Sequence, residues 1–412
     1  MKRFAVFNPE HDLALANGDA HYLAPRNIRE MAHDLAPLMD YLEWDTPWGW
    51  DAAIVSHLHK SGIPRQELPT DAMLAALRTR SERITAHHLL QQMLPLSAHL
   101  TGESYVCRSL DDIKAYATQH SHLLLKAPLS GSGKGLRHLN LNDDKNKNDN
   151  VDDSDNHPSC RRSTLMLTSS LKKIERWADA LIRRHGYLTA EPYYDKVQDF
   201  AMEFFVADGQ CHFIGYSLFT TDTHGRYDSN LLLSDADIEA RLSEYIPRSV
   251  LHDVRYFVEA HVDLIVPAEW DTSRFPITFG IDMMIVNLTG QQPTADGQQS
   301  THPDGNSQLR THNSQFKLHP CVEINLRMNM GIIAHEVRRL CLAPGSQGQY
   351  RIAIFADNAA LMSFHEEQRS RYPVEYDDGR LVRGYLPLTP IRQATRHLAY
   401  VVCEGCGIGV RG

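Results

Sequence analysis

The segment Cys321-Val322-Glu323-Ile324-Asn325-Leu326-Arg327 decides the fold. Apolar residues alternate with Glu323, Asn325 and Arg327, which is the two-residue period of a β-strand. Because successive strand side chains point to opposite faces, we expect these three polar side chains on one face. A carboxylate, an amide oxygen and a guanidinium in one row suit a Mg²⁺ ion beside a phosphate. For this segment alone, an antiparallel strand with one solvated face is the alternative.

A second apolar segment, Phe279 to Val286, carries a single carboxylate, Asp282. In isolation, the simpler interpretation is a carboxylate satisfied by a local hydrogen bond. Beside a strand that carries Glu323, however, Asp282 becomes a natural further oxygen ligand. The sequence therefore predicts a strand pair with Asp282, Glu323 and Asn325 as metal ligands.

Upstream lies a glycine-rich segment, Ser130-Gly131-Ser132-Gly133-Lys134-Gly135, between two strand candidates. Its backbone N–H groups can form an anion cradle with Lys134 at the tip, although a plain surface hairpin is the alternative. The segment matches neither a Walker A motif nor a dinucleotide-binding fingerprint. Lys126 ends the preceding apolar strand, and a buried lysine is costly unless it meets an anion. Together these features favour phosphate binding.

Composition limits the classes of protein that fit. The chain has 412 residues and a formal net charge of −9, so it suits two or three domains and argues against a general nucleic-acid binder. It contains no apolar run of the roughly 18–20 residues that cross a bilayer, and its start develops no signal-peptide apolar region. Seven cysteines, an odd number, form no disulfide framework. We expect a cytoplasmic enzyme or binding protein that does not act on membranes or nucleic acids.

The pattern along the chain predicts an α/β protein in four parts. Residues 1–80 form a small α/β unit with strands at Phe4–Phe7 and Ala52–Ser56, and a helix from Ile28 to Leu42 that Pro37 interrupts. Residues 81–190, 191–345 and 346–412 follow as a glycine-loop subdomain, a ligand-bearing subdomain and a C-terminal set of strands. Residues 142–160 and 288–316 are polar insertions without apolar surface to bury. Ser109 with Asp112 fits a capping box, and Asp208-Gly209 is a hairpin turn signal.

In type and order, these residues resemble the ATP-grasp superfamily over roughly Ser81 to Arg339. The resemblance implies two α/β subdomains that clasp ATP, after a small N-terminal domain. It implies catalytic roles near the transferred phosphoryl group for Arg327 and Lys134, and Mg²⁺ (or Mn²⁺) ligation by Asp282, Glu323 and Asn325. The residues that it implies for ATP binding are Arg83, Lys126, Ser130, Gly131, Ser132, Gly133, Lys134, Gly135, Glu191, Tyr193 and Asp199. Arg83 stands where the family has a lysine, and Asp199 is one position off the usual ribose-binding place.

The resemblance also implies a reaction. We expect an ATP- and Mg²⁺-dependent ligase that joins a small-molecule carboxylate to an amine through an acyl phosphate; a homodimer is left open. A small-molecule kinase and a nucleotide-binding module without catalysis are the alternatives.

Three further features keep two interpretations each. The polar segment Asn8–Asp12 is a cleft-facing loop or a simple helix cap, and Trp44–Trp50 packs the small domain or forms a substrate platform. Cys403 and Cys406 resemble half of a zinc motif, but no second pair completes it.

Overall fold

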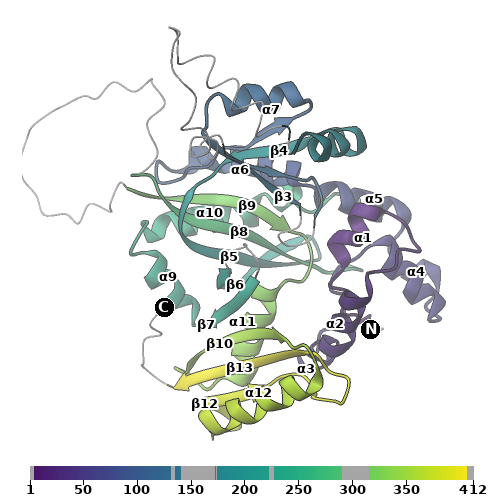
Figure 1. Ribbon diagram of the computed structural model, residues 1–412, viewed down its shortest axis with the longest axis vertical. Helices are drawn as coiled ribbons and strands as arrows, with labels where there is room; N and C mark the ends of the chain where they lie inside the picture. Colours follow the sequence, from purple (N-terminus) through teal and green to yellow (C-terminus); the bar gives the residue numbers. More distant parts are fainter. Residues whose placement is uncertain are drawn as a thin grey trace, which may run out of the picture.

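The computed structural model describes residues 4–130, 135–140, 172, 174–221, 227–289 and 315–405. It contains two antiparallel sheets, of four and nine strands, with helices packed around them (Figure 1). This arrangement confirms the predicted mixed α/β class. None of the helices in these ranges is long and apolar enough to span a membrane.

The N-terminal unit differs from the prediction, because its described part is helical. Its helices are α1 (His11–Asn17), α2 (Arg26–Leu35), α3 (Pro37–Tyr41), α4 (Ala52–Lys60) and α5 (Asp71–Arg80). The predicted break at Pro37 is confirmed, since it separates α2 from α3. Both predicted strands are wrong: Phe4–Phe7 forms a single bridge from Val6 to Pro47, and Ala52–Ser56 begins α4. Asp51 caps that helix by accepting a hydrogen bond from the Ile54 amide at 2.8 Å.

The four-stranded sheet has the order β1-β4-β2-β3. Its strands are β1 (Tyr105–Cys107), β2 (His122–Lys126), β3 (Leu136–Asn140) and β4 (Leu188–Pro192). Helix α6 (Arg83–Met93) precedes it, and α7 (Leu110–Ala117) opens with the predicted capping box of Ser109 and Asp112. Because β2 and β3 pair with Lys126 opposite Leu136, the glycine-rich segment joins two neighbouring strands.

The nine-stranded sheet has the order β11-β12-β13-β10-β7-β6-β5-β8-β9. Its strands are β5 (Asp195–Ala207), β6 (Gln210–Thr221), β7 (Tyr227–Leu232), β8 (Ile277–Asn287), β9 (Phe316–Asn325), β10 (Gln347–Ile354), β11 (Glu375–Asp377), β12 (Arg380–Pro387) and β13 (His397–Gly405). The predicted hairpin at Asp208-Gly209 is confirmed, with both residues at positive φ. Because β10 pairs with β7, the C-terminal strands extend the sheet that carries Asp282 and Glu323.

Helices and aromatic residues bury the faces of this sheet. Further helices are α9 (Asp235–Leu242), α10 (Arg248–Ala260), α11 (Met330–Cys341) and α12 (Asn358–Arg371), and residues 174–185 are also helical. Short 3-10 helices lie at Arg65–Glu67, Leu94–Leu96 and Val262–Leu264. Trp50 packs edge-on against Phe275 at 5.5 Å, and the main core joins it to residues of the large sheet. The packing interpretation therefore holds for Trp50. Cys403 is buried in β13, where its thiol lies within reach of the Gln347 and Val382 carbonyls and can donate to either one, while Cys406 lies outside the described residues.

Candidate active site

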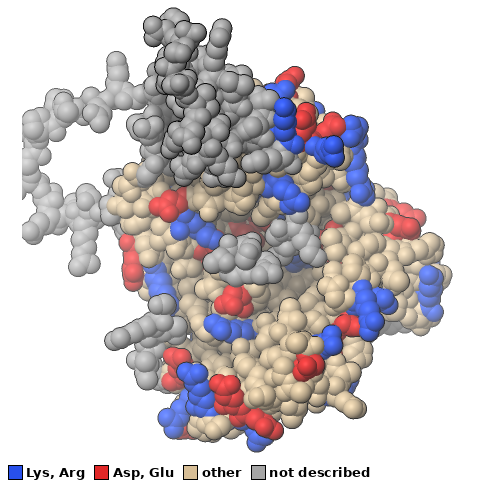
Figure 2. Space-filling view, in the orientation of Figure 1, with Lys and Arg blue, Asp and Glu red and all other residues tan. Residues whose placement is uncertain are grey.

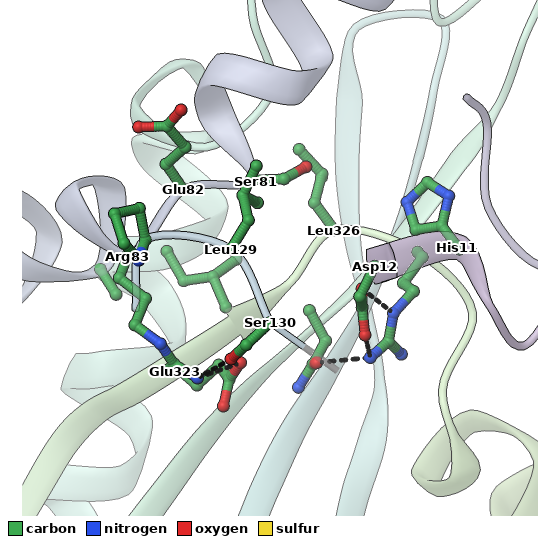
Figure 3. Close-up of a pocket in the computed structure, with 14 residues that line it drawn as sticks. His11, Asp12, Ser81, Glu82, Arg83, Leu129, Ser130, Glu323 and Leu326 are labelled. Carbon is green, nitrogen blue, oxygen red and sulfur yellow. Dashed lines mark hydrogen bonds and ion pairs between the residues drawn. The ribbon is translucent and has the colours of Figure 1, made fainter. Parts of the chain in front are cut away.

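A cavity of about 510 Å³ lies where the N-terminal unit meets the large sheet. Its lining comes from the N-terminal unit, from α6, from strands β5 to β9 and from the start of α11. A small pocket adjoins it and shares Asp12, Arg83, Glu323, Asn325 and Arg327 with it (Figure 3). On the face drawn in Figure 2, Lys and Arg side chains of the described residues alternate with Asp and Glu and form no continuous basic region. Four predicted site residues thus share one cavity edge.

The predicted metal ligands sit together on β8 and β9. Asp282 is the cross-strand partner of Glu323, and the Asn325 amide donates to the Asp282 carboxylate at 3.2 Å. Burial, and then the neighbouring charge of Glu323, raise the pKa of Asp282 to about 7. Two carboxylates that repel each other beside an amide oxygen form a donor set that fits Mg²⁺, which is usually held by one or two protein carboxylates. Across the described ranges no three His, Cys, Asp or Glu side chains converge as metal ligands, so the predicted site depends on the Asn325 amide as its third donor.

Arg83 links this pair to the glycine-rich segment. It begins α6, and its Nε donates to the Ala127 carbonyl at 3.0 Å. Its terminal nitrogen lies 3.0 Å from Glu323 Oε1 and 3.4 Å from the Ser130 hydroxyl (Figure 3). The side chain is 9% exposed. Arg83 therefore lies between the metal ligands and the expected phosphate loop, as an arginine that contacts a phosphate would.

Arg327 is held by Asp12, which the sequence analysis placed in the polar segment Asn8–Asp12 without giving it a role of its own. Its Nε donates to Asp12 Oδ1 at 2.8 Å and its terminal nitrogen to Oδ2 at 2.7 Å. The same guanidinium donates to Asn325 Oδ1 at 3.0 Å, so it touches a predicted metal ligand (Figure 3). Burial alone would raise the pKa of Asp12, but the Arg327 guanidinium more than offsets this and holds that pKa below its usual range. The two-pronged pair fixes the plane of the guanidinium.

The polar segment Asn8–Asp12 owes its position to a buried network. The Asn8 amide donates to the Gly49 carbonyl at 2.9 Å, and His11 Nδ1 lies 3.2 Å from Asp51 Oδ2. Gly49 must be glycine, since a Cβ there would lie 2.4 Å from the His11 ring. His11 and Asp12 both line the small pocket (Figure 3). The structure therefore favours the cleft-facing interpretation of this loop.

Lys126 forms a buried ion pair with Glu191. Its ammonium lies 2.5 Å from Glu191 Oε2, with 3% and 9% of the two side chains exposed. Lys126 Nζ also donates to the Val322 carbonyl at 3.4 Å, which ties β2 to the strand of Glu323. A buried lysine is thus balanced by the predicted adenine-binding carboxylate.

The remaining predicted ATP-binding residues lie apart from the cavity lining. Tyr193 is 52% exposed and stacks on His122 at 4.2 Å, and Asp199 pairs with Lys196. Ser130 and Gly135 lie side by side at the base of the glycine-rich segment, where a Cβ on Gly135 would lie 2.3 Å from Ser130. Gly131, Ser132, Gly133 and Lys134 lie outside the described residues.

A further polar group at the cavity floor escaped the sequence analysis. Glu203 on β5, Ser217 on β6, Asn230 on β7 and Asn329 before α11 all line it. Burial raises the pKa of Glu203 to about 8. The signal that could have found Glu203 is the one that marked Asp282, a carboxylate inside an apolar strand.

Comparisons with known proteins give structural likenesses alone. No protein-family model and no curated protein matches the chain. Biotin carboxylase from Campylobacter jejuni, solved with a β,γ-ATP ligand, is similar with a TM-score of 0.43 and 12% identity over 92% of this chain and 74% of that one. N5-carboxyaminoimidazole ribonucleotide synthetase from Thermus thermophilus has a TM-score of 0.41 and 11% identity, over 85% of this chain and 73% of that one. The N5-carboxyaminoimidazole synthetase of Staphylococcus aureus, complexed with ADP, has a TM-score of 0.38 and 9% identity, over 79% of this chain and 68% of that one. Likenesses at this level assign no family, so this chain's own residues carry the function proposed below.

Proposed function

We propose that this chain is an ATP-grasp ligase that uses ATP and Mg²⁺ to join a small-molecule carboxylate to an amine. One observation carries the proposal: Arg83, Asp282, Glu323, Asn325 and Arg327 meet at one cavity edge, although they come from distant parts of the sequence. Two carboxylates, an amide and two arginines form the set that phosphoryl transfer requires, which is a metal site flanked by cations that neutralise phosphate charge.

The proposed roles are those that the resemblance implies, and the positions of Arg83, Asp282, Glu323, Asn325 and Arg327 support them. Asp282, Glu323 and Asn325 would hold Mg²⁺ (or Mn²⁺), which, when bound, neutralises the charge of the terminal phosphates. Arg83 and the segment Ser130–Gly135 with Lys134 would contact the phosphates, together with Lys126. Glu191, Tyr193 and Asp199 remain our proposal for the adenosine end.

The proposed reaction has two steps. A carboxylate oxygen of the substrate attacks the γ-phosphorus, ADP leaves, and an acyl phosphate forms. The acceptor, after loss of a proton from its ammonium form, attacks the acyl carbon as the uncharged amine. The C–O bond to phosphate breaks, the nitrogen loses a further proton to solvent, and the amide and inorganic phosphate leave. The role of the protein is to position the reactants and to stabilise charge, with Arg327 beside the transferred group.

The test is a screen for ADP formation over amino acids and short peptides, with ¹⁸O in the substrate carboxylate. A ligase of this kind moves ¹⁸O into the released phosphate and gives a hydroxamate when hydroxylamine replaces the amine. A small-molecule kinase would form ADP and a stable phosphorylated product without ¹⁸O transfer. Glu323→Gln should abolish the signal, whereas Glu366→Gln, an exposed change on α12, should not. No ADP formation above the Glu323→Gln background with any substrate would refute the proposal.

A further inference from the structure

The floor of the cavity beyond the metal ligands is a row of polar side chains on three adjacent strands. The Tyr227 hydroxyl donates to Asn230 Oδ1 at 2.6 Å, and the Asn230 amide donates to the Ser217 hydroxyl at 2.7 Å. Beside them, the Asn329 amide donates to Glu203 Oε2 at 2.7 Å. The row is therefore pre-organised, and it ends in a carboxylate.

Two glycines make the slot that holds this carboxylate. A Cβ on Gly331 would lie 2.0 Å from Glu203 Oε1, and a Cβ on Gly280 would lie 2.4 Å from Oε2. Any side chain at either position would displace the carboxyl group. Glu203 is 1% exposed, yet its side chain belongs to the cavity lining. The backbone on both sides is thus shaped around a carboxylate at the cavity floor.

Glu203 forms no ion pair with a Lys, Arg or His side chain among the residues that the structure describes. The two arginines of the cavity pair with other carboxylates, Arg327 with Asp12 and Arg83 with Glu323. Burial raises the pKa of Glu203 and outweighs the charges of His335 and Arg327, which act on it without pairing with it. A buried carboxylate without a directly paired cation costs free energy. A cation supplied by a ligand would restore the ionised form.

The position of Glu203 relates it to the proposed reaction centre. In the β5–β8 register Glu203 lies opposite Gly280, and Ala201 lies opposite Asp282. Glu203 is therefore two residues further along the sheet than the metal-ligand pair, about 7 Å at the rise of a strand. That separation suits a group of a second substrate placed next to the phosphoryl centre.

The N-terminal unit supplies a mostly apolar part of the cavity lining. Its apolar members include Leu13, Ile28, Met31 and Trp48, and Asp12 and Asn27 line the cavity beside them. A ligand that fits both this part and the polar floor carries one positive charge on an apolar body.

We propose that Glu203, with Ser217 and Asn230 beside it, is the subsite for the ammonium group of the acceptor amine, and that the acceptor is a primary amine with an apolar body. The inference rests on the proposed ligase function and names the class of its second substrate. An ammonium group donates three hydrogen bonds, which the Glu203 carboxylate and the Ser217 and Asn230 oxygens can accept.

The test measures binding without turnover. Calorimetric titrations with hexylamine, hexan-1-ol and hexanoate are run on the full chain with MgADP at pH 8.5, where hexylamine is still an ammonium. We expect hexylamine to bind at least about tenfold more tightly than hexan-1-ol, because a hydrogen bond between charged groups is worth at least that factor. Equal affinities would overturn the subsite, and this comparison of probes on the unaltered chain needs no variant.

Variants locate the effect. Glu203→Gln keeps the shape of the side chain and should lose the preference for hexylamine while MgADP affinity stays within about twofold, whereas Glu366→Gln should keep both. A preference for hexylamine that survives Glu203→Gln places the ammonium elsewhere and overturns the proposal.

The outcomes separate this inference from the ligase function. Glu203-dependent binding of hexylamine without any ADP formation would keep the subsite and refute the ligase. Amine-dependent ADP formation that Glu203→Gln leaves unchanged, in KM for the amine as in kcat, would keep the ligase and refute the subsite.

Discussion

The pair of Asp12 and Arg327 joins the first helix to the end of the metal-ligand strand, and Asp12→Asn tests what it contributes. Asparagine keeps the shape but removes the charge and one acceptor, so the guanidinium loses its counter-charge. Removing one partner of a fully buried pair costs about 3–5 kcal/mol. Here 14% of the Arg327 side chain and 23% of the Asp12 side chain are exposed. Arg327 also keeps its hydrogen bonds to Asn325 and to the Met328 carbonyl. We therefore expect a loss of about 2 kcal/mol in the free energy of unfolding.

Thermal unfolding at pH 7 measures this loss, which should appear as a melting temperature about 2 °C lower for a chain of this length. Asp71→Asn is the matched control, because Asp71 pairs with Arg65 at 2.7 Å while 97% of its side chain is exposed. It should change the melting temperature little, since exposed pairs contribute little. A similar loss of melting temperature in both variants would show that the buried Asp12 pair stabilises the fold no more than the exposed Asp71 pair does.

The pH dependence has a definite sign. Because the pKa of Asp12 in the folded protein lies below its unfolded value of 3.8, its stabilisation is present above that value and disappears as the pH falls through the folded pKa. The difference between the unaltered chain and Asp12→Asn should therefore be full at pH 7 and vanish in acid. A difference that persists below the folded pKa would mean that shape, and not charge, is responsible. With a turned-over substrate, Asp12→Asn should also lower kcat about ten- to hundredfold, since Arg327 is no longer oriented.

Three further predictions concern nucleotide and metal. Mg-ATP should raise the melting temperature more than Mg²⁺ alone, and equal shifts with and without nucleotide would contradict the proposed site. Lys126→Ala should reduce the rise with Mg-ATP, because it removes a charged contact worth roughly 1.5–3 kcal/mol. Glu323→Gln should leave the circular dichroism spectrum unchanged but lower turnover at least about a hundredfold, and a wild-type rate would make Glu323 an ordinary strand residue. Because the pKa of Asp282 is raised to about 7, the folded chain binds more protons than the unfolded one between about pH 4 and 7, so this group's contribution to stability falls as pH rises. Asp282→Asn should make the slope shallower, with the remainder coming in part from Glu203, whose pKa is also raised. Denaturant titrations across this range that show the same slope in both proteins would exclude a contribution from Asp282.

The sequence predicted the parts of the site that lie on regular strands. The alternation at Cys321–Arg327 and the lone carboxylate Asp282 predict two neighbouring strands that carry their polar side chains on a shared face. In the structure these strands pair, with Asp282 opposite Glu323. Residue types alone also predicted the capping box at Ser109 and the helix break at Pro37, and the structure shows both. These features depend on neighbours within a few residues, which a sequence displays directly.

The errors and omissions have two physical causes. Ala52–Ser56 is a short apolar run that suits a strand or a helix, and the cap of Asp51 with the buried spacing of Ile54, Val55 and Leu58 settles it as a helix. The contact of Asp12 with Arg327 spans 315 positions, and no local pattern encodes it. The slot around Glu203 is formed by glycines on other elements, so it becomes visible only in three dimensions.

The ion pairs of the site suggest how a nucleotide would be accommodated. Within the part of the chain that the structure describes, three cations near the proposed phosphate position are each balanced by a carboxylate: Arg83 by Glu323, Arg327 by Asp12 and Lys126 by Glu191. Only the first of these pairs uses a predicted metal ligand. When Mg²⁺ and ATP bind together, Glu323 can exchange Arg83 for the metal while Arg83 exchanges Glu323 for a phosphate, so that neither charge is left buried without a partner. The Asp12 pair involves no metal ligand and need not break, which leaves Arg327 oriented throughout. We therefore expect Arg83 to be the cation that changes partner on binding, and Arg327 to be the one that stays in place.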